Sequence, residues 1–479
     1  MRPGDLSAHD RGLFRVKKKT PGRKALWGGG FVAEPGEALT RLSVSHPFDR
    51  RLARQDIAGS RAHARGLARA GLLSKGDLAK IEKGLAAIEK EIGRGSFRFS
   101  DRDEDVHLNI ERRLIELAGD AGKRLHAGRS RNDQVALDLR LWTVEAIGRV
   151  GASLRDLGNA LLDRAAEFLE EGVVVAARTH LRSAQPVLLA HVFHAYAEML
   201  LRDFARFSDS RRRAAVSPLG SGACTGTTLP LDRVGVAREV GLGAISANSL
   251  DAVSDRDFVA EFLAAVALAM VHLSRLSEDL ILSSGEEFLL FTLSEETTTG
   301  SSMMPQKRNP DSLELVRGKT GRAIGYLTGV LATLKGLPLS YNRDLQEAQE
   351  PLFDAATTLE TSAAAMVEAV RGLSLRPAED RPPIGSSLFA TDIAEELVRR
   401  GVPFRTAHER VSRWSRHAAQ ACADLREVAA TEAPSLRPFL ERLTADSSVS
   451  RRDLPGGTAA RRVRSAIART RRLLERQLS

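Results

Sequence analysis

Residues Asp133–Glu171 read DQVALDLRLWTVEAIGRVGASLRDLGNALLDRAAEFLEE, and this stretch decides the fold. Apolar residues recur along it at steps of three or four without an intervening proline: Val135, Leu139, Trp142, Ala146, Val150, Leu154, Leu157, Leu161, Ala165 and Phe168. That period predicts one amphipathic helix, about 57 Å long at 1.5 Å per residue. A small monomeric domain cannot cover a stripe of that length, so we expect it to pack along other long helices.

Four further segments carry an apolar stripe with few helix breakers, and we predict helices at Pro186–Arg213, Asp257–Ser283, Ser312–Leu334 and Glu350–Arg371. Between the helices lie segments rich in glycine, proline and polar residues: Gly128–Asn132, Ser217–Pro230, Thr297–Pro310 and Gly336–Asp344. Functional residues tend to lie on such loops, held by a rigid scaffold. The pattern predicts an all-α protein with a basic tail (1–24), an N-terminal domain (25–128), a central helical bundle (129–377) and a C-terminal helical domain (378–479).

Composition narrows the class of protein. The chain has 479 residues, of which 43% are hydrophobic and only 5% aromatic, and its two cysteines lie far apart. These values suit a helical protein of two or three domains in the reducing cytoplasm, without a membrane span. The formal charge of +10 is spread over helical faces and both termini without interleaved aromatic residues. We therefore expect an anionic small molecule as the partner, and neither nucleic acid nor a membrane.

Three local patterns resemble known sites and are rejected. Gly318-Lys319-Thr320 lacks the first glycine of a phosphate-binding loop, because that position is Leu313. His191 and His194 have metal-ligand spacing but no further ligand at a suitable offset, so we expect no metal. Gly220-Ser221-Gly222 does not have the glycine spacing of a nucleophile elbow, and a turn is the better interpretation.

The loop Thr299–Asp311, reading TGSSMMPQKRNPD, offers the chemistry of a flexible loop that closes over a substrate. Lys307 and Asn309 carry donors for a carboxylate. Ser301 can act as a base only if nearby donors stabilise its alkoxide. The alternative is a plain polar loop.

Two further segments place polar groups directly ahead of a predicted helix. In His126–Gln134, Ser130, Asn132 and Asp133 can cap the long helix, while the two arginines and the helix N-terminus can also bind an anion. In Arg178–Pro186, Thr179 and His180 lie in a predicted loop. There the histidine is either structural or an acid.

These segments resemble those of the fumarase/aspartase superfamily and, within it, the argininosuccinate lyase family. The shared stretches are Leu26–Gly29, Asp49–His63, Glu104–His107, Gly128–Gln134, Asn248–Phe258, Gly300–Asp311, Gly401–Phe404 and Gly456–Thr458. The resemblance implies a three-domain fold whose central helices form the twenty-helix core of a homotetramer, with each active site shared between subunits. It also implies reversible cleavage of argininosuccinate to fumarate and L-arginine, in arginine biosynthesis, without a metal or organic cofactor.

The resemblance assigns roles residue by residue. Ser301 matches the base that removes the Cβ proton, and Lys307 matches the group that stabilises the carbanion. His180, with Glu314, matches the group that assists departure of the guanidino nitrogen. Substrate-binding positions are matched by Ser45, Ser130, Arg131, Asn132, Thr179, Asn309, Tyr341, Gln346 and Gln349.

Three positions depart from the family pattern: Gly30 and Gln349 replace an arginine and a substrate-binding lysine, and Arg182 replaces a glutamine. Loss of a positive charge at Gln349 should weaken the binding of a carboxylate. One alternative is therefore a related lyase that releases fumarate from another N-substituted aspartate. A second is a non-catalytic structural protein like the δ-crystallins of the family.

Overall fold

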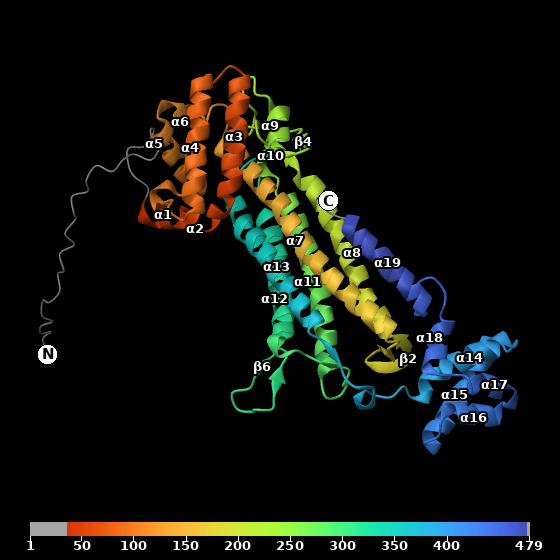
Figure 1. Cartoon of the computed structure of the whole chain (residues 1–479). Coiled ribbons are helices and arrows are strands. Elements are labelled where there is room, and N and C mark those ends of the chain that lie inside the picture. Colours follow the sequence, from red (N-terminus) through yellow and green to blue (C-terminus); the bar gives the residue numbers. More distant parts are fainter. Residues whose placement is uncertain (1–35, 477–479) are drawn as a thin grey trace, which may run out of the picture.

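Five long helices form the centre of the molecule: α7 (Arg131–Glu170), α8 (Leu189–Ala214), α11 (Asp257–Ser284), α12 (Asp311–Leu334) and α13 (Gln349–Arg371). The computed structural model describes residues 36–476 of the chain. In Figure 1 the five helices run side by side from the N-terminal part to the opposite end of the molecule. The predicted all-α bundle is confirmed, and one continuous apolar core runs through it. The domain boundaries remain a prediction.

The N-terminal part stacks short helices on one end of the bundle. It contains α1 (Glu37–Ser43), α2 (His46–Asp49), α3 (Ala53–Arg69), α4 (Lys75–Gly93), α5 (Val106–Ala118) and α6 (Asp120–Arg124). The connection between α8 and α11 carries α9 (Arg233–Glu239) and α10 (Ser249–Ser254) at the same end. The Leu26–Gly29 stretch, the basic tail and the Gly30 departure lie outside the described residues.

A second apolar cluster lies beyond the other end of the bundle and spans residues 389–443. It is formed by α14 (Ala390–Arg399), α15 (Phe404–Ala421), α16 (Leu425–Glu432) and α17 (Arg437–Leu440). After α18 (Ala445–Arg451), helix α19 (Ala460–Arg476) returns along α7 and α8. Gly158 of α7 makes this approach close, because a Cβ there would lie 2.8 Å from a methyl carbon of Leu474.

The strands in the described part of the chain are short and pair two by two. The longest pair is β1 (Val174–Thr179) with β2 (Arg182–Leu188), antiparallel. The others are β3 (Val216–Ser217) with β4 (Ala244–Ile245), β5 (Phe291–Thr292) with β8 (Ser374–Leu375), and β6 (Thr299–Gly300) with β7 (Arg308–Asn309). They shape connections at the ends of the bundle.

The hairpin of β1 and β2 corrects two predictions. The helix predicted from Pro186 begins at Leu189, and the segment predicted as a loop ahead of it is mostly strand. Pro186 has no amide hydrogen to donate, yet it fits in the ladder opposite Ala176. The turn consists of His180 and Leu181, whose φ angles are 54° and 58°. Two successive residues in the left-handed region are typical of a tight two-residue hairpin turn, at a cost in backbone strain because neither is glycine.

Helix α11 has the length and mean hydropathy of a membrane span, and 56% of its most apolar window is buried in this structure. It packs against α8, α12 and α13. Its apolar character therefore serves the centre of the bundle.

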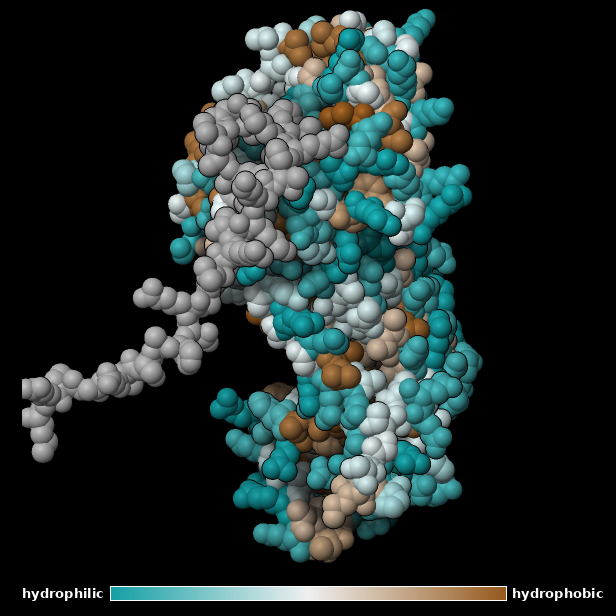
Figure 2. All heavy atoms as spheres, turned by 90° about the vertical axis from the view of Figure 1, so that its left-hand side faces the viewer, coloured by the Kyte–Doolittle hydropathy of each residue, from teal (hydrophilic) through white to brown (hydrophobic). Residues whose placement is uncertain are grey.

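Helix α12 has one face with no cover in the described chain. Leu315, Ile324 and Leu331 are 61%, 46% and 51% exposed. Four glycines on the same helix, Gly318, Gly321, Gly325 and Gly329, have no heavy atom within 4 Å of where a Cβ would stand. Figure 2 shows the side of the molecule that includes α12, where apolar patches interrupt a largely hydrophilic surface.

Candidate functional site

The N-terminus of α7 is fixed by a capping box. Ser130 Oγ accepts a hydrogen bond from the Asn132 amide at 3.3 Å, and Asp133 Oδ1 accepts one from the Ser130 amide at 2.8 Å. Asp133 Oδ2 also accepts from the amides of Gly220 and Gly222 at 3.0 and 2.8 Å. The predicted capping is confirmed. The same contacts hold the turn at Gly220–Gly222 against the start of the helix.

Arg131 is the charged group at this helix start. Its Nε lies 2.9 Å from Asp105 Oδ2, and its Nη1 donates to Gln134 Oε1 at 2.5 Å. The side chain is 22% exposed, so the guanidinium reaches the surface while held on two sides. The side-chain amide of Asn132 donates a hydrogen bond from Nδ2 to the Ala223 carbonyl at 3.0 Å. This end of α7 thus presents guanidinium and backbone donors suited to an anion.

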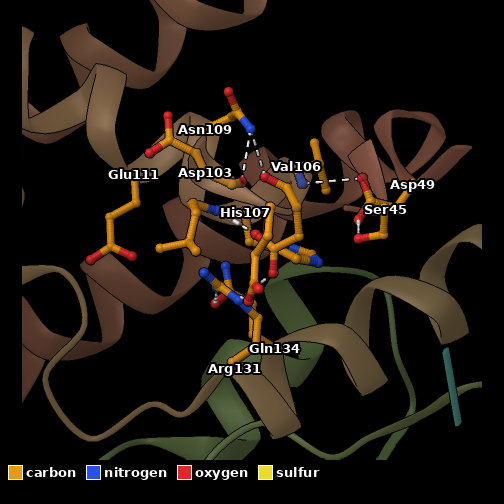
Figure 3. A network of polar contacts seen from close by, with 12 residues as sticks. Ser45, Asp49, Asp103, Val106, His107, Asn109, Glu111, Arg131 and Gln134 are labelled. Atoms are coloured by element: carbon orange, nitrogen blue, oxygen red, sulfur yellow. Dashed lines mark hydrogen bonds and ion pairs between the residues drawn. The ribbon is translucent and has the colours of Figure 1, made fainter. Parts of the chain in front are cut away.

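Ser45 lies across from this helix start and is 2% exposed. Its hydroxyl donates to Asp49 Oδ2 at 2.6 Å, and Asp49 Oδ1 accepts from the Val106 amide at 3.1 Å. Burial raises the pKa of Asp49 to about 6, against the lowering effect of His107 and of these hydrogen bonds. Figure 3 shows Ser45 and Asp49 on one side of this network and Arg131 with Gln134 on another.

Three more predicted binding residues lie at the same end. Tyr341 is half-buried, and burial raises its pKa although the charges of Arg256 and Arg343 oppose this. Arg343 donates to the Ser43 carbonyl at 2.8 Å, which ties the Tyr341 loop to the Ser45 segment. Gln346 lies in the short helix Arg343–Ala348, and Gln349 begins α13. Gln349 is 5% exposed, and its Oε1 has no hydrogen-bond donor among residues 36–476.

The proposed acid lies at the other end of the bundle. Thr179 and His180 are both exposed, the histidine in the tight turn between β1 and β2. The Arg178 guanidinium lies 4.3 Å from the ring centre of Phe288, which places the hairpin against the segment that follows α11. The His180 side chain is exposed in this strained turn.

The loop Thr299–Asp311, called the signature loop below, also lies at that end, where β6 and β7 form a hairpin that leads into α12. Ser301 Oγ accepts hydrogen bonds from the amides of Met303 and Met304, at 3.3 and 3.1 Å. Two amide donors to one hydroxyl oxygen stabilise its alkoxide. A serine needs such stabilisation to act as a base. Lys307 is exposed and Asn309 is half-buried. The donors of both residues are thus carried on the hairpin that holds Ser301.

A single chain does not bring the predicted residues together. Ser45, Ser130, Arg131, Asn132, Tyr341, Gln346 and Gln349 lie at one end of the bundle; Thr179, His180, Ser301, Lys307, Asn309 and Glu314 lie at the other. Helix α7, with 40 residues, separates the two groups by about 60 Å. Glu314 pairs with Arg317 at 3.8 Å in this subunit, and His180 lies on a different element. Within one chain the two groups of predicted residues therefore lie at opposite ends of the bundle.

Sequence reasoning missed the buried charges beneath Arg131. Asp56 of α3, His107 of α5 and Asp138 of α7 meet with each side chain 1% exposed. The sequence does carry a signal, because Asp138 interrupts the apolar face of the longest helix between Val135 and Leu139. An unpaired buried carboxylate is costly, so such a residue needs a partner. The partners come from other helices, which the helical period alone does not identify.

The same three side chains could hold a metal ion by geometry, since their ligand atoms all lie within 4.8 Å of one another. The nearby charges oppose this. Arg129 and Arg131 both act on Asp138 electrostatically. The imidazole of His107 lies between the two aspartates, 3.2 Å from Asp56 Oδ1 and 3.3 Å from Asp138 Oδ2, where an imidazolium would supply positive charge without a metal.

The comparisons with known proteins decide the family. The sequence profile of a lyase family matches residues 36–325, and that of the argininosuccinate lyase C-terminal region matches residues 387–449. The argininosuccinate lyase of Moorella thermoacetica is 48% identical over 94% of this chain and 98% of its own length. The chain belongs to the argininosuccinate lyase family. The resemblance of the sequence motifs is confirmed, and the protein is a lyase.

Other relatives agree. The argininosuccinate lyase of Thiobacillus denitrificans is 48% identical over 93% of this chain and 97% of its own. Among solved structures, a variant of EDDS lyase with bound fumarate has a TM-score of 0.79 and 26% identity, covering 91% of this chain and 89% of that one. The predicted fumarase/aspartase-like fold is confirmed.

Proposed function

We propose that this member of the argininosuccinate lyase family cleaves argininosuccinate reversibly to fumarate and L-arginine, as a step of arginine biosynthesis in the cytoplasm. The observation that carries the proposal is the identity of 48% to argininosuccinate lyases over nearly the whole chain. The geometry of the signature loop supports it, because the Ser301 hydroxyl is held by two amide donors.

In the proposed mechanism, Ser301 removes the Cβ proton of the substrate. The negative charge that develops on the neighbouring carboxylate is stabilised by Lys307, which sits on the same hairpin. Donors fixed in place before the reaction stabilise such charge more than mobile water does. Asn309 adds an amide donor beside Lys307.

His180, with Glu314 from another subunit, assists departure of the guanidino nitrogen. His180 is exposed in the left-handed turn, so α12 of a neighbouring subunit can meet it. Thr179 precedes it and binds substrate.

The remaining residues bind substrate at the N-terminal end of the bundle. Arg131 binds a substrate carboxylate through its guanidinium, while neutral hydrogen-bond donors come from Ser130, Asn132 and Ser45. This part of the proposed binding site also includes Tyr341, Gln346 and Gln349.

The active protein in this proposal is a homotetramer with shared sites. Two observations support it: the distance of about 60 Å between the two groups of residues in one chain, and the uncovered face of α12. Glycines without contacts allow helix backbones to approach closely. The exposed Leu315, Ile324 and Leu331 supply apolar area for burial.

The test is direct. Purified protein mixed with argininosuccinate should release fumarate, followed by its ultraviolet absorbance, and the Ser301→Ala variant should lose turnover while it keeps the native mass and melting temperature. No fumarate at high enzyme concentration would contradict the substrate. Near-normal rates for Ser301→Ala would contradict the base.

A second candidate is a lyase that releases fumarate from another N-substituted aspartate. Gln349 and Arg182 favour it, since they alter charge near the proposed site. A panel of aspartates that carry different amines separates the two candidates. Turnover of none of them would favour a non-catalytic role.

A further inference from the structure

A buried histidine between two aspartates lies directly beneath Arg131. His107 Nδ1 is 3.2 Å from Asp56 Oδ1 and 3.3 Å from Asp138 Oδ2. One ring nitrogen carries one proton, so it cannot make a full hydrogen bond to both carboxylates. The two aspartates must therefore differ.

Their surroundings show the difference. Asp56 Oδ1 also accepts a short hydrogen bond from Gln134 Nε2. Neither oxygen of Asp138 has a hydrogen-bond donor among residues 36–476. Two carboxylates this close do not both ionise in a dry interior, and the one with donors keeps the charge. Asp56 is therefore the anion and Asp138 the neutral acid.

The electrostatics agree with the geometry. Burial raises the pKa of Asp138 well above its usual range, and the charge of Asp56 adds to this. Burial also acts on Asp56, but the hydrogen bond and charge of His107 outweigh it and lower the pKa of Asp56. For His107, burial is outweighed by Asp56 and Asp105, which raise its pKa to about 9. The imidazole is therefore charged at neutral pH.

This pair connects to the surface through one side chain. Gln134 donates to Asp56 with its nitrogen, and its Oε1 accepts from Arg131 Nη1 at 2.5 Å. Because Asp56 fixes the nitrogen end of the amide, the oxygen end must face Arg131. With Asp105 on Nε at 2.9 Å, the guanidinium is held on two edges, and Nη2 is left to bind a ligand.

We propose that Asp56 and His107 form a positioning unit that, through Gln134, orients Arg131 for a substrate carboxylate, while Asp138 is carried as a neutral acid. The inference rests on the proposed binding role of Arg131. It assigns a positioning role to three residues that touch no substrate: Asp56, His107 and Gln134. It also distinguishes Asp56, as the anion, from Asp138, as the neutral acid.

The experiment compares Asp56→Asn with Asp138→Asn in the full-length protein. Both changes replace a buried carboxyl group by an amide of nearly the same shape. For Asp138 the amide replaces a neutral acid of the same shape, so the dissociation constant of fumarate, measured by calorimetry, should stay within about threefold. For Asp56 the anion that holds Gln134 is lost, and misplacement of Arg131 should weaken fumarate by about 10- to 100-fold. The KM for argininosuccinate should rise more than kcat falls.

Gln134→Leu is the second variant. It keeps the Asp56–His107 pair but removes both hydrogen bonds of the Gln134 side chain, to Asp56 and to Arg131. It should therefore weaken fumarate binding as Asp56→Asn does, even if Asp56→Asn fails to fold. A merely structural cluster predicts equal losses of melting temperature for the two Asn variants and unchanged fumarate affinity in Gln134→Leu.

Equal effects of the two Asn variants on fumarate affinity, or a larger effect of Asp138→Asn, would overturn the inference. So would one equivalent of a divalent metal in the purified protein that Asp138→Asn loses, because Asp138 would then be an anionic ligand. Failure of the wild type to bind fumarate would overturn it as well. If fumarate binds with the expected contrast but argininosuccinate is not turned over, only the proposed substrate fails.

Discussion

Two inactive variants with lesions at opposite ends of the bundle should restore activity when they are combined in one tetramer. Ser301→Ala removes the proposed base at one end, and Arg131→Ala removes the carboxylate fork at the other. The two positions are separated in a single chain by the length of α7, about 60 Å. A site built from different subunits can therefore take an intact Arg131 from one variant and an intact Ser301 from the other.

The structure sets the size of the recovery. In tetramers assembled at random from equal amounts of the two variants, about half of the sites receive an intact Arg131 and about half of those an intact Ser301, so about one quarter of the sites are complete. Each homogeneous variant has none. We expect the mixture to regain about one quarter of the wild-type rate.

The assay is unfolding and refolding of an equimolar mixture, followed by measurement of fumarate release per subunit. Mixing without unfolding is the control, and activity that appears only after refolding would show that recovery depends on reassembly of the subunits. A double variant, Arg131→Ala with Ser301→Ala in the same chain, is refolded with wild type as the matched control: shared sites leave about one quarter of the sites complete, whereas sites within one chain would leave about one half. Refolded mixtures with native mass and no activity would refute the shared site.

Three further outcomes are expected. Gly325→Leu should stabilise α12 of a free subunit by about 0.8 kcal/mol through helix propensity, but it should cost about 1–3 kcal/mol per subunit by inserting a side chain into the proposed contact between subunits. Light scattering should therefore show dissociation of the tetramer. Gly148→Leu is the control, because Gly148 is also free of contacts but lies among charged neighbours on α7, and the tetramer should stay intact. Gln349→Lys should lower the KM for argininosuccinate if the position faces a substrate carboxylate; an unchanged KM would show that it does not. His107 faces Asp56, Asp105, Asp138 and Arg131, and its pKa of about 9 in the folded protein lies above the usual 6.5. The contribution of its charge to stability is therefore complete below pH 6.5 and is lost as the pH rises through about 9. Over that range the melting temperature of the wild type should fall more than that of His107→Gln.

The architecture could be predicted because it depends on long periodic segments. The apolar period of Asp133–Glu171 predicted α7 to within two residues at its start and one at its end, since little competes with a helix of that length. The hairpin at Val174–Leu188 was missed. Val174 and Val175 form too short a strand pattern to recognise, and Pro186 is as acceptable before a helix as in an edge strand.

The chemistry divides in the same way. The signature loop was recognisable because Gly300, Pro305 and Pro310 disfavour a helix around Ser301 and Lys307, although its ends pair as the short strands β6 and β7. The buried unit was not, because Asp56, His107 and Asp138 come from three helices and lie within 4.8 Å of one another only after packing. Periodicity identifies which face of a helix is buried, but it does not identify which polar residues on those faces meet.

The length of α7 links assembly to catalysis. A shorter helix could bring its two ends within reach of one active site, and a single subunit would then carry every group. At about 60 Å it cannot, and the apolar stripe that makes the helix so long also needs partner helices to cover it. The same residues that demand assembly therefore separate Arg131 from Ser301. In the proposed tetramer, a subunit that is released should therefore lose its site, because half of the groups would leave with its neighbours even if its own fold is unchanged.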